Sequence, residues 1–277
     1  MTTRSVRRTR RIRRTLRAPL PAAAALLALS ACSSSSGSDT GPGSAGSSSS
    51  SKVSGQVTVF AAASLKESFT ALGETFEKQH PGTEVTFNFA GSDTLAASIT
   101  SGAPADVFAS ASPRTMATVT DAGATAGAPT TFVRNQLEIA TLPGNPDRIS
   151  SLEDLTGPGL KIVLCDTSVP CGAATRQALA AAGLELTPVS YEQDVKAALT
   201  KVELKEADAA VVYRTDVRAA GDKVTGVDFP ESAEAVNDYP IALLEEAPNA
   251  RAAKAFNDMV KSAEGRRVLT GAGFRTP

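Results

Sequence analysis

From residue 56 onward, apolar positions alternate between a spacing typical of strands and one typical of helices. Runs rich in β-branched and aromatic residues predict strands at 56–60, 85–89, 106–110, 160–165, 208–213 and 238–244. Between them, apolar residues recur three or four positions apart and predict helices that begin near 64, 92, 113, 172 and 194, with a last one over 248–262. Such alternation is typical of α/β folds, in which helices cover mostly parallel sheets.

The first 31 residues follow neither spacing. They contain eight arginines, no acidic residue and an apolar stretch over 18–30 that is short for a bilayer span. This layout predicts a secretory signal peptide over 1–31, although it does not separate the export routes. The segment Leu29-Ser30-Ala31-Cys32 resembles a bacterial lipoprotein cleavage site, so we expect Cys32 to carry lipid. An ordinary cleaved signal with an incidental cysteine is the alternative.

Residues 32–54 are dominated by serine and glycine and contain few apolar side chains. Such a segment buries too little apolar surface to form a core, so we predict a flexible tether. A lipid on Cys32 followed by this tether predicts an extracytoplasmic protein that is anchored to the outer face of the cell membrane.

The formal net charge of −1 averages two unlike regions. After the signal peptide the chain has 20 basic and 29 acidic residues, a net charge of −9. An acidic body argues against nucleic-acid binding through phosphate neutralisation. The single histidine, His80, and three cysteines argue against a Ser-His-Asp triad, a histidine-based metal site or a tetrahedral zinc site. We therefore expect no cofactor and no direct cation site.

The ends of the predicted strands carry hydroxyl groups and small residues instead of acids and bases. In open α/β sheets, ligands bind beyond the carboxyl ends of the strands, where helices begin. Unpaired backbone N–H groups gather at these helix starts, so the sequence predicts an anion site built from neutral donors. The candidate donors are Ser64, Ser92, Cys171, Val195 and Tyr213. The alternative is that each serine is only a helix N-cap and that the tyrosine is only a packed aromatic residue.

Six segments together carry a resemblance to a known family. They are Val59–Leu65, Phe89–Leu95, Gly102–Phe108, Val169–Gly172, Asp194–Val195 and Val211–Tyr213. Over these segments, and from about Val57 to Phe274 as a whole, the sequence resembles the periplasmic molybdate-binding proteins of bacterial ABC importers. The resemblance implies the two-lobed fold of type II periplasmic binding proteins, with the ligand in the cleft.

The resemblance also implies a role for each candidate donor. Ser64 and Ser92 would each offer a hydroxyl and a backbone amide to a molybdate or tungstate oxyanion. Cys171 and Val195 would offer backbone amides, and Tyr213 its phenolic hydroxyl. The implied protein is a monomer that is not an enzyme, and it delivers the anion to an ABC permease in the membrane.

Two positions depart from the family pattern. Gly91 stands where relatives often have serine, and Cys171 stands where they commonly have alanine. Cys165 and Cys171 lie six residues apart around a tight loop in an oxidising compartment. A disulfide that pins this loop is therefore expected, with two separate buried thiols as the alternative.

The expected domain organisation places 55–133 and 231–277 in lobe 1 and 134–230 in lobe 2. The chain would cross between the lobes near Val133-Arg134 and near Phe229–Glu231, and these crossings would form a hinge. Three other functions stay open at this point. They are binding of another ligand such as sulfate, phosphate or ferric ion, a Ser or Cys hydrolase, and a purely structural lipoprotein.

Overall fold

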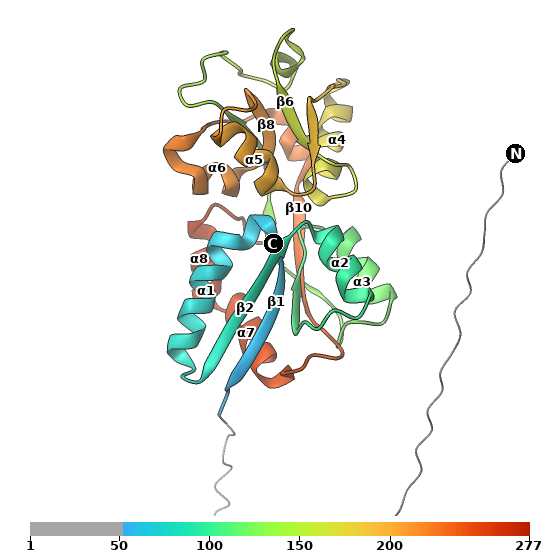
Figure 1. The fold of residues 1–277 in the computed structure, drawn as a ribbon, viewed down its shortest axis with the longest axis vertical. Helices are drawn as coiled ribbons and strands as arrows, with labels where there is room; N and C mark the ends of the chain where they lie inside the picture. The colour runs from blue at the N-terminus through green and yellow to red at the C-terminus, as the bar shows by residue number, and fades with distance from the viewer. Residues whose placement is uncertain (1–51) are drawn as a thin grey trace, which may run out of the picture. The chain divides into compact units, whose positions relative to one another are not determined.

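The computed structural model describes residues 52–277. The predicted signal peptide, Cys32 and nearly all of the predicted tether lie outside these residues. The described chain forms two five-stranded sheets, each with its own helices, and Figure 1 shows them as two lobes. We call the part that contains β1 (Gly55–Ala62) lobe 1 and the part that contains β6 (Ile162–Cys165) lobe 2.

Lobe 1 has the strand order β2-β1-β3-β10-β4. Its other strands are β2 (Thr83–Ala90), β3 (Val107–Ala109), β4 (Thr130–Asn135) and β10 (Asn237–Leu243). Its helices are the 3₁₀ helix η1 (Ala63–Leu65), α1 (Lys66–Gln79), α2 (Ser92–Thr100), α3 (Pro113–Asp121), α7 (Ala250–Lys261) and α8 (Ala263–Gly271). Its apolar residues Leu65, Phe69, Leu72 and Phe76, spaced three or four positions apart, are all buried in one core.

Lobe 2 has the strand order β7-β6-β8-β5-β9. Its other strands are β5 (Leu137–Thr141), β7 (Ser190–Glu192), β8 (Ala209–Tyr213) and β9 (Thr225–Val227). Its helices are α4 (Pro170–Ala182), α5 (Val195–Glu203), α6 (Arg214–Ala220) and the 3₁₀ helices η2 (Glu153–Thr156), η3 (Gly221–Lys223) and η4 (Pro230–Ala235). Helix α4 begins two residues before the predicted start and ends at Ala182, and its C-cap is Gly183, whose φ of 68° is left-handed.

Both sheets are mixed rather than mostly parallel. In lobe 1, β1 pairs in parallel with β2 and β3, whereas β10 runs antiparallel to β3 and β4. In lobe 2, β6 pairs in parallel with β7 and β8, whereas β5 runs antiparallel to β8 and β9. Parallel neighbours need a long crossover connection, which the alternating helices provide. The antiparallel pairs involve strands at which the chain changes lobes, where no α-helix intervenes.

The chain passes between the lobes twice. The first passage is at Gln136, between β4 and β5, and the second is the segment 228–236 between β9 and β10, which includes η4. Because both passages are short, the carboxyl ends of strands in the two lobes come close to each other. The candidate donors lie at these ends.

No helix in the described part of the chain is both long and apolar enough to cross a membrane.

Candidate anion-binding site

A small cavity lies where the two lobes meet, and all five candidate donors line it. Its volume is about 20 Å³, enough for about one water molecule. Its lining residues are Ala62, Ala63, Ser64, Ala90, Gly91, Ser92, Ala111, Val169, Pro170, Cys171, Asp194, Val195 and Tyr213. The lining is mostly small side chains, so a ligand in this cavity would contact backbone amides and hydroxyls directly.

Ser64 lies in η1, at the carboxyl end of β1, and its side chain is buried. Its hydroxyl is 2.8 Å from the hydroxyl of Tyr239 on β10. Ser64 and Glu67 have the spacing of a capping box, but the box does not form. The N-cap position of α1 is Leu65 without a side-chain cap, and Glu67 pairs with Lys196 instead. Ser64 is therefore not a helix cap, and its hydroxyl stays at the cavity.

Ser92 is the first residue of α2 and is only 1% exposed. The N-cap position belongs to Gly91, so the simple N-cap role does not apply to Ser92 either. Its Oγ accepts a hydrogen bond of 3.0 Å from the amide of Ala111, which also lines the cavity. Because the oxygen accepts this bond, the hydroxyl hydrogen stays available to donate to a ligand.

Cys171 is the second residue of α4, and the structure joins it to Cys165 at the end of β6 by a disulfide. The first intrahelical bond runs from the Ala173 amide to the Val169 carbonyl, so the Cys171 amide precedes the hydrogen-bonded part of the helix. The loop between the cysteines is tightly folded, since a Cβ at Gly172 would lie 2.0 Å from the Asp166 carbonyl oxygen. The disulfide and this packing hold the Cys171 amide at the cavity.

The first turn of α5 has one amide that its cap does not use. Asp194 is the N-cap, and its carboxylate accepts hydrogen bonds from the amides of Lys196 at 2.8 Å and Ala197 at 2.9 Å. The Val195 amide donates no hydrogen bond to this cap, and Val195 lines the cavity. The cap therefore accepts hydrogen bonds from the two inner amides and leaves the outermost amide available to a ligand.

Tyr213 ends β8 and is 1% exposed. Within residues 52–277 its hydroxyl is buried without a hydrogen-bond partner, although it belongs to a cavity-lining residue. Burial raises the pKa of this phenol well above its ordinary value, and the nearby Tyr239 and Asp216 act in the same direction. The hydroxyl therefore stays protonated and can donate a hydrogen bond. A buried polar group without a partner is uncommon in folded proteins, which suggests that a ligand supplies it here.

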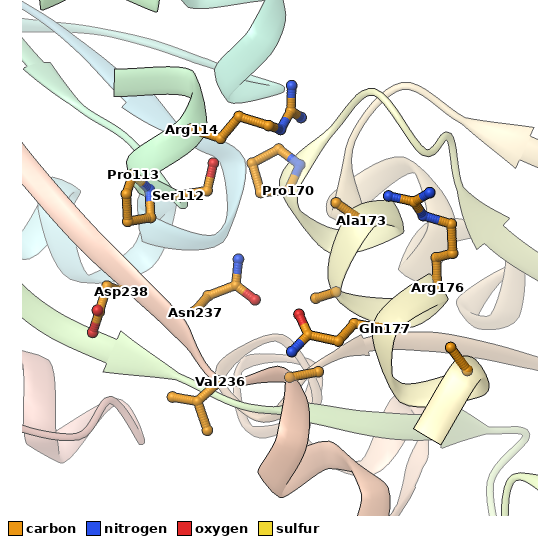
Figure 2. Close-up of a pocket in the computed structure, with 13 residues that line it drawn as sticks. Ser112, Pro113, Arg114, Pro170, Ala173, Arg176, Gln177, Val236, Asn237 and Asp238 are labelled. Atoms are coloured by element: carbon orange, nitrogen blue, oxygen red, sulfur yellow. The ribbon is translucent and has the colours of Figure 1, made fainter. Parts of the chain in front are cut away.

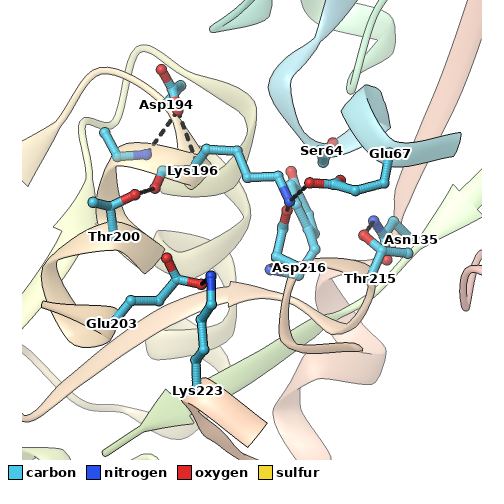
Figure 3. A network of polar contacts seen from close by, with 12 residues as sticks. Ser64, Glu67, Asn135, Asp194, Lys196, Thr200, Glu203, Thr215, Asp216 and Lys223 are labelled. Atoms are coloured by element: carbon cyan, nitrogen blue, oxygen red, sulfur yellow. Dashed lines mark hydrogen bonds and ion pairs between the residues drawn. The ribbon is translucent and has the colours of Figure 1, made fainter. Parts of the chain in front are cut away.

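A charged network that sequence reasoning missed lies behind the donors (Figure 3). Lys196 Nζ is 3.1 Å from Asp216 Oδ1 in lobe 2 and 2.9 Å from Glu67 Oε1 in lobe 1. Asp216 is fully buried, and its other oxygen accepts the Tyr213 amide at 3.3 Å. Burial raises the pKa of Asp216 to about 6, and Lys196 opposes this shift. Burial lowers the pKa of Lys196, but Asp216 and Glu67 together raise it above its ordinary value.

One signal in the sequence points to this network. Glu67 follows Ser64 by three positions, Lys196 follows Val195 by one, and Asp216 follows Tyr213 by three. Charged residues within one helical turn of a predicted donor are candidates for supporting it. Whether they meet each other depends on tertiary packing that the spacing does not reveal.

A larger groove of about 570 Å³ lies beside the small cavity and is lined by α3, α4 and the start of β10 (Figure 2). Several of its polar groups are already engaged. Arg114 donates to the Ser168 carbonyl, Gln177 to the Glu234 carbonyl, and Asn237 to the Ala111 carbonyl at 2.8 Å. We therefore consider the small cavity, where the buried Tyr213 hydroxyl has no partner among the described residues, to be the candidate functional site.

Two α/β lobes with a small donor-lined site between them define a solute-binding protein. The family model for bacterial extracellular solute-binding proteins matches residues 57–275, and the chain belongs to this family. The molybdate-binding protein ModA of Mycobacterium tuberculosis is 48% identical over 221 residues, which cover 80% of this chain and 85% of that protein. The molybdate-binding protein ModA of Escherichia coli is 33% identical over 231 residues, covering 79% and 89%.

Solved structures show the same fold. The periplasmic molybdate-binding protein of Azotobacter vinelandii superposes with a TM-score of 0.71 at 21% identity, covering 80% of this chain and 99% of that chain. The sulfate-binding protein SubI of Mycobacterium tuberculosis gives a TM-score of 0.68 at 18% identity, covering 80% and 86%. At these identities the likeness concerns the fold alone.

The protein binds a solute and is not an enzyme, as its family shows. In residues 52–277 no group of three or more histidine, cysteine, aspartate or glutamate side chains has the arrangement of a metal site.

Proposed function

We propose that this protein is the extracytoplasmic substrate-binding component of an ABC importer and that it captures molybdate, and also tungstate, for delivery to the membrane permease. The observation that carries the proposal is the convergence of Ser64, Ser92, Cys171, Val195 and Tyr213 on one cavity of about 20 Å³. The molybdate-binding relatives support the choice of ligand.

Neutral donors suffice for a doubly charged anion. Burial strips the anion of water at a large free-energy cost, and hydrogen bonds to a charged group contribute about 1.5–3 kcal/mol each. The two serines would each donate a hydroxyl and an amide, and the other three residues one group each. Seven such bonds would contribute on the order of 10–20 kcal/mol, from which the cost of closing the lobes is subtracted. Among the described residues that line the cavity, none is basic, so this sum comes from dipoles.

The donor set also suggests how the site discriminates between anions. A fully deprotonated tetrahedral oxyanion only accepts hydrogen bonds and matches a lining of donors. Phosphate near neutral pH retains a proton, which would need an acceptor. The one carboxylate in the lining, Asp194, accepts two backbone amides through Oδ1 as the cap of α5, so a proton on the anion would find only its Oδ2. Sulfate has no proton at this pH, and only its smaller size would distinguish it from molybdate.

Lobe closure is the mechanism that this geometry supports. Ser64 and Ser92 belong to lobe 1, and Cys171, Val195 and Tyr213 belong to lobe 2. An anion that binds both sets favours the closed arrangement, because only that arrangement satisfies all donors at once. We propose that the two lobes move as units about the two chain passages, at Gln136 and at 228–236, close to the boundaries at 133–134 and 230–231 expected from the sequence.

Titration calorimetry of the purified protein with molybdate, tungstate, sulfate and phosphate tests the ligand assignment. We expect one bound anion per chain, similar affinities for molybdate and tungstate, and affinities for sulfate and phosphate that are more than about tenfold weaker, a difference of 1.4 kcal/mol. Sulfate binding as tight as molybdate binding would refute the assignment and favour a general oxyanion carrier.

The anchoring part of the proposal concerns residues outside the described structure. We propose that Cys32 becomes the lipid-modified N-terminus and holds a monomer at the outer face of the membrane. Mass spectrometry of the membrane-associated protein would show the lipid adduct. Cys32→Ser should release the protein from the membrane fraction, and its retention there would contradict lipid anchoring at this residue.

A further inference from the structure

Residues 193–196 of lobe 2 contact lobe 1 on both sides of Val195. On one side the Gln193 carbonyl faces Gly91, and on the other Lys196 pairs with Glu67. Val195, whose amide is a proposed donor, lies between these two contacts. The position of this amide relative to lobe 1 therefore depends on how closely the two lobes approach at these two contacts.

Gly91 permits the first contact because it has no side chain. A Cβ at this position would lie 2.5 Å from the Gln193 carbonyl oxygen and 3.2 Å from Val169 Cγ1, both in lobe 2. It would also lie 2.7 Å from Asp93 Oδ1, but that atom is the end of a side chain that can rotate away. The Gln193 oxygen belongs to the backbone and can move only if the loop or the whole lobe moves.

The backbone conformation of Gly91 does not itself require glycine. Its φ of −56° and ψ of 135° are open to any residue. Close approach of the lobes is thus the structural reason for glycine at this position. An added methyl group would act as a spacer between the lobes without straining the loop that carries it.

The second contact is an ion pair that bridges the lobes. Glu67 lies in the first turn of α1 and Lys196 in the first turn of α5, and Figure 3 shows their side chains meeting. The side chain of Lys196 is 21% exposed and that of Glu67 is 50% exposed. Asp216 holds the ammonium group from within lobe 2, so it is already positioned when Glu67 arrives from lobe 1.

We propose that Gly91 and Glu67 are positioning residues that set how completely the lobes close over Val195, and thereby how long the bound anion stays. Gly91 permits the closest approach, and Glu67 favours it through Lys196. The inference rests on the proposed function, because the bound anion provides the measurement. Neither side chain is assigned a direct bond to the anion, so both act through the distance between the lobes.

The test compares the release rates of radiolabelled molybdate, chased with unlabelled molybdate, in wild-type protein and in Gly91→Ala, Gly91→Ser and Glu67→Gln. We expect both Gly91 variants to release molybdate about tenfold faster or more. Glu67→Gln should release it about threefold faster, as suits a partly exposed ion pair. The melting temperature of the ligand-free protein should change little in all three variants, because the contacts act on closure.

Matched controls are present in the chain. Gly271→Ala adds the same methyl group in α8, where no atom lies within 4 Å of the new Cβ. Glu206→Gln removes an ion pair of 2.7 Å with Lys201 that stays within lobe 2. Neither control should change the release rate.

Three outcomes separate the possibilities. Unchanged release rates in all three variants would overturn the inference. A lower melting temperature of the ligand-free variants with unchanged release would also overturn it, because it would indicate a structural role. Failure of the wild-type protein to bind molybdate would refute the proposed function itself, and this is distinguishable because the defect would precede any substitution.

Discussion

The two halves of the proposed site hold their donors in different ways. In lobe 1, the hydroxyls of Ser64 and Ser92 are themselves part of the framework, since they bond to Tyr239 and to the Ala111 amide. In lobe 2, the amides of Cys171 and Val195 are held from behind, by a disulfide and by the Asp194 cap. The proposed donor groups of lobe 1 would therefore combine a ligand role with a structural role, whereas in lobe 2 different groups would have these two roles.

This difference predicts which substitutions affect binding. In lobe 1 a side-chain change removes a donor and loosens its neighbours at the same time. In lobe 2 most side chains can change while the backbone amides remain, with Tyr213 as the exception. The disulfide and the cap instead determine how precisely those amides are placed. The predictions below test this contrast, in order of decreasing effect on molybdate affinity.

Ser92→Ala should have the largest effect. It removes a hydroxyl donor and also leaves the buried Ala111 amide without its partner. Because a charge-assisted hydrogen bond contributes about 1.5–3 kcal/mol, we expect affinity to fall by more than about tenfold in titration calorimetry. Ser112→Ala is the matched control, since Ser112 caps α3 through the Thr115 amide and does not line the cavity. It should lower stability by about 1 kcal/mol and leave affinity unchanged. Equal affinities for Ser92→Ala and wild type would reduce Ser92 to a structural role.

Tyr213→Phe should reduce affinity by about tenfold, the equivalent of one charge-assisted bond at the low end of its range. Its effect on the ligand-free protein should be the opposite of that in lobe 1. Removing a buried hydroxyl that has no partner removes a desolvated polar group, so the ligand-free melting temperature should stay equal or rise. Tyr239→Phe provides the contrast, because that hydroxyl bonds Ser64 and Asn135 and its loss should destabilise the protein. A ligand-free Tyr213→Phe protein that melts earlier than wild type would contradict this account.

Replacing both Cys165 and Cys171 by alanine should have a moderate effect on affinity and a clear one on stability. The bridge closes a short loop, so the entropic model gives about 2 kcal/mol of stabilisation. The Cys171 amide remains in the variant, and we expect affinity to fall only several-fold as the loop becomes less ordered. Thermal unfolding of wild type with and without reductant should reproduce the stability difference. An affinity loss as large as that of Ser92→Ala would show that lobe 2 depends on its side chains as much as lobe 1 does.

Much of this site follows from local rules. The carboxyl ends of β1, β2 and β8 and the starts of α4 and α5 face the same cleft, so five residues chosen for their positions at these ends line one cavity. Ser112 at the start of α3 and Gly183 at the end of α4 also behave as their local signals indicate. These features depend on a few neighbouring residues, and the sequence is therefore informative about them.

Other features depend on partners that lie far away in the chain. The capping box at Ser64 satisfies the local pattern, but Tyr239, 175 residues away, takes the hydroxyl instead. The short strands β4, β5, β7 and β9 and the helices α6 and α8 were not predicted. Strands β4 and β5 follow each other across the lobe boundary without the helix that marks the other units. The Glu67–Lys196–Asp216 network joins three elements, and only tertiary packing brings these residues together.

The buried carboxylate behind lobe 2 gives the last prediction, in which the effect on binding is smallest. Asp216 has a pKa of about 6, above its ordinary value of 3.8, chiefly because it is buried. The folded protein therefore binds this proton more tightly than the unfolded chain does. The contribution of Asp216 to the free energy of unfolding should fall by on the order of 2–3 kcal/mol as pH rises from about 4 to about 6. Above pH 6 it should stay low. Glu138, whose pKa is raised to about 7 chiefly by burial, adds a slope of the same sign.

The difference between wild type and Asp216→Asn in urea unfolding at several pH values isolates Asp216, because Glu138 is common to both. Lys196 and Glu67 face the same carboxylate and are common to both proteins. Molybdate affinity should change by less than about threefold in this variant, since the Tyr213 hydroxyl and the Val195 amide both remain. If the free energies of unfolding of the two proteins differ by the same amount at every pH from 4 to 7, Asp216 stays ionised in the folded state, held by Lys196 alone.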